Sequence, residues 1–236
     1  MHPEKMNQEE FKDVSLEFQV NDFVNLARKI FPSCNKFDFA GFSFGGRVAM
    51  AIASTHPHMI RKLHLTGVSA SRDEFGNIIL SSWKDMLKSK TNDGFPSSGE
   101  LIGFAWSIIM TTYSEEFLAS CGSEKIRTWV DHIQSCNSAS GLYALIDQTN
   151  SVSDENDPWH PLSVARRICE SKENGHIIEG KIFVGSKDKI STPSSAQKLS
   201  EIIGWGNVHI YDGIGHAVPM ESARIWRKDL VKFLKQ

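Results

Sequence analysis

The sequence predicts an α/β protein with a mostly parallel sheet, crossover helices and a helical insertion. Three observations support this fold class. Helix-like and strand-like apolar patterns alternate over residues 15–67, and the same alternation returns from residue 162 to the C-terminus. Residues 71–161 contain no strand pattern. Because alternating helices and strands form parallel sheets, we divide the chain into core segments 1–70 and 162–236 and an insertion, 71–161.

The first core segment begins with apolar residues at helical spacing over residues 15–31, and Pro32 ends this helix. An apolar run at residues 37–40 predicts a strand. Residues 48–57 predict the following helix, and residues 62–67 predict a second strand.

The second core segment resumes the alternation with a helix near residues 162–169 and a buried strand at 181–185. A helix at 194–203, a last strand at 207–211 and a closing helix at 221–234 follow. The residues of the closing helix expected to face inward are Ile225, Trp226, Leu230, Phe233 and Leu234.

The insertion predicts four helices, at residues 78–87, 101–118, 124–136 and 139–150, with breaks between residues 92 and 99. It holds four of the six tryptophans: Trp83, Trp106, Trp129 and Trp159. Composition alone leaves two interpretations open, a layer that covers the sheet or a lid over a pocket.

Composition favours a protein that binds a small ligand. A chain of 236 residues with a net charge of −2 fits one domain, and the balance favours a roughly uncharged small molecule over nucleic acid. Residues 1–13 are polar, which predicts neither a signal peptide nor an anchor, and the apolar run 101–110 is too short to span a bilayer.

The cysteines predict a reducing compartment. They are far apart and form neither a metal-binding nor a disulfide pattern: Cys34, Cys121, Cys136 and Cys169. We expect mostly buried thiols, a cytoplasmic location, and no metal or cofactor.

A G-x-S-x-G motif, residues 41–45, lies between the first predicted strand and its helix. This context is typical of a nucleophile elbow, in which a strained serine projects its hydroxyl at the head of a helix. We expect Gly41 and Gly45 to remove clashes that a Cβ would cause. The alternative is a plain turn with Ser43 as an N-cap.

Ser43, Asp188 and His216 each directly follow a predicted strand, so a parallel sheet brings them to one edge. A serine needs a base within hydrogen-bond reach, and the imidazole needs a carboxylate to set its tautomer. Asp188 could instead form a turn beside two lysines. Asp212 is an inferior acid candidate, because it shares a loop with His216 and would have to fold back.

With these motifs the sequence resembles α/β-hydrolase-fold proteins of the esterase, lipase and iminopeptidase-like group. The resemblance is carried by residues 41–46, 184–193 and 213–221, and it covers nearly everything from Ser15 onward. It implies that Ser43 is the nucleophile, Asp188 the acid and His216 the base, with the Phe44 N–H as one oxyanion donor. It also favours a helical cap for residues 71–161.

The chain departs from this family before Ser43. Members reach the elbow after a first half-sheet, whose loop supplies the second oxyanion N–H, often near a His-Gly pair. Here only one predicted helix precedes the first strand, and no His-Gly pair occurs before Ser43. We favour an N-terminally truncated isoform or gene model over a shortened protein of weak or absent activity. The unpaired sheet edge predicts self-association.

The predicted function is hydrolysis of a carboxylic ester or related small acyl compound. Phe42, Phe44 and the tryptophans, Trp106 among them, predict a pocket for an apolar or aromatic group. One alternative is a non-catalytic binding protein. Others are C–C bond, amide or N-terminal proline cleavage. An iminopeptidase would need cap carboxylates to hold an amine, and the available ones are Glu115, Glu116, Asp131, Asp147 and Glu155.

Overall fold

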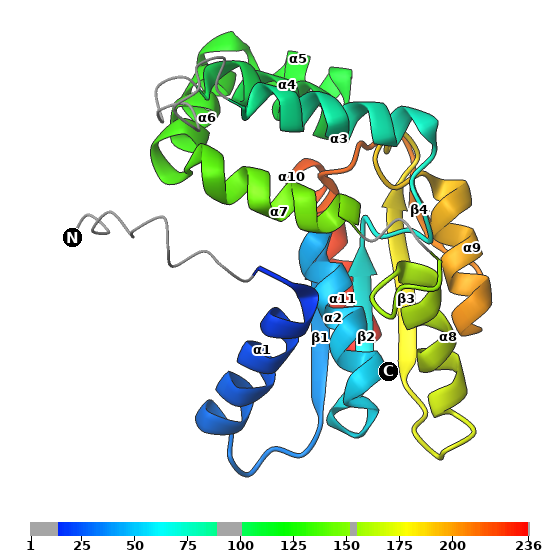
Figure 1. Ribbon diagram of the computed structural model, residues 1–236. Coiled ribbons are helices and arrows are strands. Elements are labelled where there is room, and N and C mark those ends of the chain that lie inside the picture. The colour runs from blue at the N-terminus through cyan, green and yellow to red at the C-terminus, as the bar shows by residue number, and fades with distance from the viewer. Residues whose placement is uncertain (1–13, 89–100, 152–154, 236) are drawn as a thin grey trace.

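The computed structural model describes residues 14–88, 101–151 and 155–235 (Figure 1). Within them one sheet contains four strands in the order β1 (Phe37–Phe42), β2 (Ile60–Thr66), β3 (Glu179–Gly185) and β4 (His209–Tyr211). Every neighbouring pair is parallel, so all four carboxyl ends lie at one edge. The predicted α/β class is confirmed. The expectations for residues 1–13 and for the breaks at 92–99 lie outside the described residues.

Helices cover both faces of the sheet. On one face pack α1 (Leu16–Ile30), α2 (Phe44–Thr55), α8 (Pro161–Ser171) and α9 (Pro193–Ile203). A 3-10 turn, η2 (Pro57–Met59), leads from α2 into β2. On the other face lie the short α10 (Val218–Glu221) and α11 (Ala223–Lys235). This arrangement leaves the carboxyl edge of the sheet for the insertion.

The side chains of β2 show how the two faces differ. Leu63 and Leu65 join the apolar core beneath α2, α8 and α9. On the opposite face, the Trp226 indole N–H donates to Thr66 Oγ1 at 2.9 Å, and Lys62 Nζ donates to the Phe233 carbonyl at 3.1 Å. Side chains at alternate positions of β2 therefore hold α11 against this face of the sheet through hydrogen bonds.

The closing helix differs from its prediction in two ways. It is divided at Ser222 into α10 and α11, and Ile225 is exposed rather than inward-facing. A helix on the outside of a sheet buries only the stripe of its surface that faces the sheet.

His64, on the α11 face of β2, is fully buried, and its ring stacks on Phe183 with centroids 4.0 Å apart. Burial lowers the pKa of His64 to about 4. The unfolded chain binds this proton near pH 6.5 and the folded protein only near pH 4, so the unfolded state holds more protons between these values. We therefore expect the free energy of unfolding to fall by about 3 kcal/mol as pH drops from 6.5 to 4.

Urea unfolding of wild type and His64→Phe at a series of pH values measures this effect. His64→Phe keeps an aromatic ring in place and should lose much less stability across this range. His58→Gln is the control, because His58 is exposed. If His64→Phe and wild type lose stability equally, another group carries the acid sensitivity.

The insertion lies as a group of helices over the carboxyl edge of the sheet (Figure 1). Its helices are α3 (Glu74–Met86), α4 (Ile102–Thr112), α5 (Glu115–Cys121), α6 (Ser123–Cys136) and α7 (Ala139–Ser151). The single helix predicted over 101–118 is wrong. Tyr113 and Ser114 have extended backbones there, and the Ser114 hydroxyl accepts from the Phe117 N–H at 3.4 Å to cap α5.

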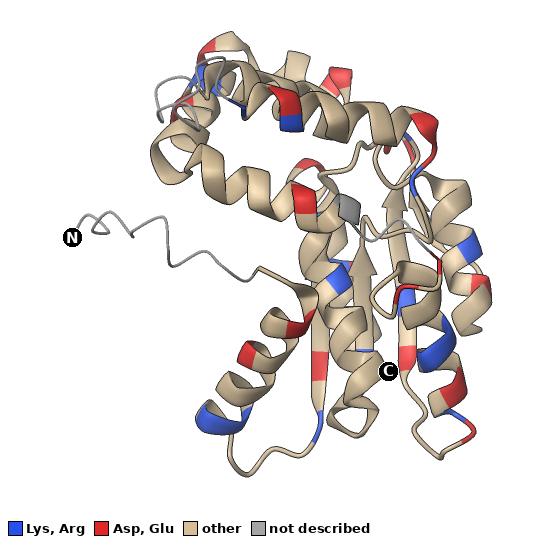
Figure 2. Ribbon diagram, viewed as in Figure 1, with Lys and Arg blue, Asp and Glu red and all other residues tan. Residues whose placement is uncertain are grey.

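Charged residues of both signs are scattered over the helices, and neither sign forms a continuous stripe in this view (Figure 2). All four cysteines are free, but Cys34 and Cys136 are exposed and Cys121 and Cys169 half-buried, so the expectation of mostly buried thiols is wrong. None of the described helices has the length and apolarity to cross a membrane.

Among described residues β1 pairs only with β2, and self-association at its other edge stays a prediction.

Candidate active site

Ser43 occupies a strained turn between β1 and α2. Its φ of 51° and ψ of −122° make it the one non-glycine residue with positive φ in the described part of the chain. Such a conformation costs about 1–3 kcal/mol and persists where surrounding structure holds it. A Cβ on Gly41 would lie 2.6 Å from Gly46 Cα, so glycine is required there as predicted.

The prediction for Gly45 is wrong. Gly45 is exposed, and a Cβ on it would meet nothing within 4 Å. The next residue, Gly46, carries the constraint instead, because its Cβ would lie 2.5 Å from Val68 Cγ1. The close approach is therefore between α2 and the segment after β2.

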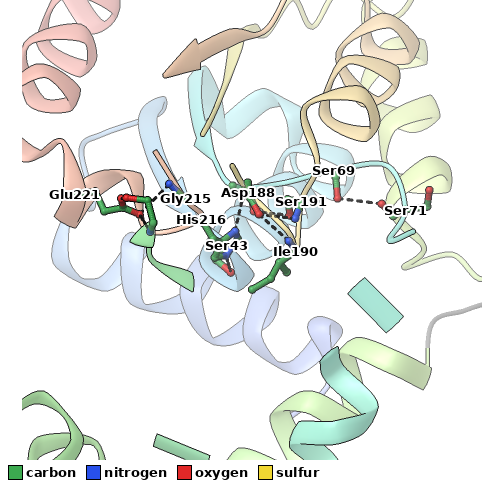
Figure 3. A network of polar contacts seen from close by, with 11 residues as sticks. Ser43, Ser69, Ser71, Asp188, Ile190, Ser191, Gly215, His216 and Glu221 are labelled. Atoms are coloured by element: carbon green, nitrogen blue, oxygen red, sulfur yellow. Dashed lines mark hydrogen bonds and ion pairs between the residues drawn. The ribbon is translucent and has the colours of Figure 1, made fainter. Parts of the chain in front are cut away.

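The structure brings the three predicted residues into one chain of hydrogen bonds (Figure 3). Ser43 Oγ lies 2.9 Å from His216 Nε2, and His216 Nδ1 lies 2.8 Å from Asp188 Oδ2. The other carboxylate oxygen, Asp188 Oδ1, accepts from the Ile190 N–H at 2.9 Å and the Ser191 N–H at 2.8 Å. The carboxylate is therefore held in one orientation. His216 and Asp188 are both buried, which strengthens their interaction.

Asp212 does not take the place of Asp188. It is exposed, and its carboxylate accepts from the Ser186 hydroxyl at 3.2 Å. The turn-forming role considered for Asp188 is present as well, because the two N–H groups it accepts belong to its own loop. One carboxylate thus shapes the loop and faces the imidazole.

Two glycines at strand ends let the imidazole approach the sheet. Gly67 follows β2 with φ of 63°, and a Cβ there would lie 2.9 Å from His216 Cε1. A Cβ on Gly185, at the end of β3, would lie 2.1 Å from the Gly215 carbonyl oxygen. The sequence reasoning treated both only as strand ends. A glycine at the carboxyl end of a strand was the signal that could have identified them.

Glu221 is a site residue that the sequence reasoning missed. Its carboxylate accepts from the Gly215 N–H at 2.9 Å, from the Ser114 N–H at 3.1 Å and from the Ser114 hydroxyl. The Ala217 N–H also donates to the Thr112 carbonyl at 3.0 Å. The loop that carries His216 is therefore tied to the junction of α4 and α5. The carboxylate five residues after the histidine was the available signal.

A cavity of about 1220 Å³ opens at Ser43 and His216, beneath the helices of the insertion. Phe42 and Phe44 line it, and the Phe42 ring centroid lies 5.3 Å from that of His216. Trp106 is not among the described residues that line the cavity, so its predicted pocket role is wrong. Its ring packs instead in a cluster of α4, α5 and α6.

Two other insertion tryptophans, Trp83 and Trp129, line the cavity instead. Trp129 stacks with Tyr113, with centroids 5.4 Å apart, and Phe117 lies alongside both. These rings form an aromatic wall of Tyr113, Phe117 and Trp129. In the described segments, no three metal-ligating side chains converge.

Comparisons with known proteins bear on the fold. No family model matches the sequence. A pyrrolizixenacetamide deacetylase from Xenorhabdus hominickii is 28% identical over 91 residues, which are 38% of this chain and only 30% of the deacetylase. The chain is similar in structure to an alpha/beta hydrolase enzyme from a Medee basin deep-sea metagenome library, with a TM-score of 0.71 and 18% identity, over 94% of this chain and 72% of that one.

An enol-lactonase from Burkholderia xenovorans is similar to the same degree. Its TM-score is 0.69 and its identity 16%, over 94% of this chain and 74% of the lactonase. The parallel sheet, the strand, turn and helix around Ser43 and these structural likenesses show that the chain has the α/β-hydrolase fold.

Proposed function

We propose that the protein is a serine hydrolase that cleaves a carboxylic ester or a related acyl compound. The observation that carries the proposal is the hydrogen-bond chain from Ser43 through His216 to Asp188. With Asp188 accepting from Nδ1–H, the Nε2 atom of a neutral His216 is free to accept the Ser43 proton. The deacetylase and the enol-lactonase, by their names, act on acyl compounds, which supports the same class of reaction here.

In the proposed mechanism, His216 Nε2 takes the proton of Ser43 as Oγ forms a bond to the substrate carbonyl carbon. His216 then gives this proton to the departing alcohol oxygen as the C–O bond breaks, which leaves an acyl group on Ser43. Water, deprotonated by His216, attacks the acyl carbon and releases the acid. Ser43 recovers its proton from His216, so the residues end as they began.

The Phe44 N–H is the proposed oxyanion donor. Phe44 is the first residue of α2, where N–H groups have no carbonyl partner within the helix and the helix dipole favours negative charge. One such donor contributes about two to three orders of magnitude in rate. We assign no second donor among the described residues.

We further propose that residues 71–161 form a cap over the cavity and that the substrate has an apolar or aromatic group. The aromatic wall supports this assignment, since its rings suit such a group. Cleavage of an amide or a C–C bond remains an alternative on the same fold. The iminopeptidase alternative loses support, because none of its five candidate carboxylates is among the described residues lining the cavity. The cytoplasmic location stays a prediction.

Labelling with a fluorophosphonate tests the proposal. We expect one adduct, mapped by peptide mass spectrometry to Ser43, because only this hydroxyl faces His216 Nε2 in the described site. Ser186, whose hydroxyl donates to Asp212, is the internal control and should stay unmodified. A folded protein without an adduct on Ser43 would contradict the proposal and favour the second candidate, a binding protein that uses the same cavity.

A further inference from the structure

Among the described residues that line the cavity, the charged side chains are all basic. Three basic side chains line it, those of Arg47, Arg72 and Lys125, whereas no Asp or Glu is among the described lining residues. Lys125 is exposed and lies over the Trp129 ring, at the aromatic wall. The two arginines lie elsewhere on the cavity wall, near Thr149 of α7. An unbalanced positive wall attracts an anion, since low-dielectric walls focus the field.

Arg47 has a buried N–H group without a hydrogen-bond acceptor among the described residues. It lies on α2 one turn after Ser43, and its Nη1 donates to the Thr149 carbonyl at a long 3.4 Å. Its Nη2 is buried and has no hydrogen-bond acceptor among the described residues. Burial lowers the pKa of Arg47 to about 10, although Asp157 acts in the opposite direction, so the group remains charged at neutral pH. A buried guanidinium N–H without an acceptor is costly.

Arg72 and His160 converge on the same region. Arg72 donates to the same Thr149 carbonyl, at 3.3 Å from Nη1 and 3.4 Å from Nη2. Burial and the neighbouring Arg47 lower the pKa of Arg72 to about 10. His160 Nδ1 accepts from the Leu162 N–H at 3.2 Å, so the neutral ring carries its proton on Nε2 as a further donor.

We propose that Arg47 and Arg72 form a carboxylate-binding subsite, so that the substrate is an acyl compound bearing a carboxylate apart from its scissile carbonyl. This deepens the proposed function and rests on it. Arginine suits the role because its planar fork pairs with both carboxylate oxygens. Among the described residues that line the cavity, Arg47 Nη2 is the one buried guanidinium nitrogen without an acceptor, and the two oxygens of a carboxylate are enough to meet it, whereas a phosphate would bring three. The aromatic wall takes the apolar remainder of the substrate.

The test measures binding without turnover. Calorimetry on the Ser43→Ala protein compares 4-phenylbutyrate with its uncharged amide, 4-phenylbutyramide. We expect the acid to bind at least tenfold more tightly than the amide. Arg47→Gln in the same background should weaken binding of the acid by about ten- to a hundredfold, the range of a hydrogen bond to a charged group. It should leave the affinity for the amide unchanged. Arg47→Lys should fall between the two.

Arg167→Gln is the matched control. Arg167 is another partly buried arginine, which donates to Ser54, and it is not among the residues lining the cavity. Its variant should bind the acid as tightly as the parent, and circular dichroism checks that each variant is folded. Equal binding of acid and amide, or an equal loss in Arg47→Gln and Arg167→Gln, would overturn the subsite. Stronger binding of phenyl phosphate than of 4-phenylbutyrate would overturn the choice of a carboxylate.

Fluorophosphonate labelling keeps the two proposals distinguishable. Labelling of Ser43 without preference for the acid would overturn the subsite and leave the hydrolase proposal standing. Preference for the acid without labelling of Ser43 would overturn the substrate assignment, because the carboxylate site would then belong to a binding protein.

Discussion

Ser43→Ala is expected to lower kcat for ester hydrolysis by on the order of 10⁶-fold, the loss seen when the nucleophile of another serine hydrolase is removed. Within the described residues, Ser43 Oγ is the hydroxyl that faces His216 Nε2. Alanine leaves no oxygen to attack the carbonyl. Steady-state hydrolysis of an aryl ester at saturating substrate measures the loss.

This variant should keep its fold, because the described hydrogen bond of the Ser43 hydroxyl is the one to His216. Thermal unfolding followed by circular dichroism provides the control, with a midpoint close to that of wild type. Folded Ser43→Ala protein that retained more than a small fraction of wild-type kcat would rule out Ser43 as the nucleophile.

Asp188→Asn is expected to lower kcat by about 10⁴-fold, as the equivalent change does in another serine hydrolase. The amide can still accept the Ile190 and Ser191 N–H groups, so the loop should keep its shape. Its NH₂ group would, however, face His216 Nδ1 and favour the tautomer with the proton on Nε2. That imidazole cannot accept the proton of Ser43.

Asp212→Asn is the matched control for this experiment. Asp212 lies in the neighbouring loop and contacts Ser186, so its variant should retain nearly all of the wild-type kcat. A comparable loss in both variants would show that the negative charge of the region matters rather than the contact of Asp188 with His216.

Much of the fold could be predicted from the sequence, because its elements are strongly periodic. The helix from residue 15 illustrates this. Leu16, Val20, Val24 and Ala27 recur at spacings of three and four, they are buried, and the Ser15 hydroxyl caps the helix by accepting from the Phe18 N–H at 3.1 Å. The strands of the parallel sheet were found by their apolar runs in the same way. Such signals depend only on residues close in the sequence, so they can be interpreted without knowledge of the tertiary contacts.

Predictions within the insertion failed where packing decides. Trp106 and Trp129 both lie on amphipathic or apolar helices, and helical spacing does not say which face meets a cavity. Trp106 is half-buried against the apolar cluster of α4, α5 and α6, whereas Trp129, which packs against the same cluster, also lies on the cavity wall. The break at Tyr113 was missed, although the serine that follows is a good N-cap.

By itself the sequence determined the order of Ser43, Asp188 and His216 and their positions directly after strands, because strand and turn signals are local. Only the tertiary structure decided that their side chains meet at 2.9 and 2.8 Å, that Glu221 ties the His216 loop to the insertion, and that two arginines line a cavity without a described carboxylate. The overall charge of −2 concealed this last feature. The physical reason is that a charge interacts with what lies beside it in space, and Thr149, whose carbonyl accepts from Arg47, is 102 positions away in the sequence.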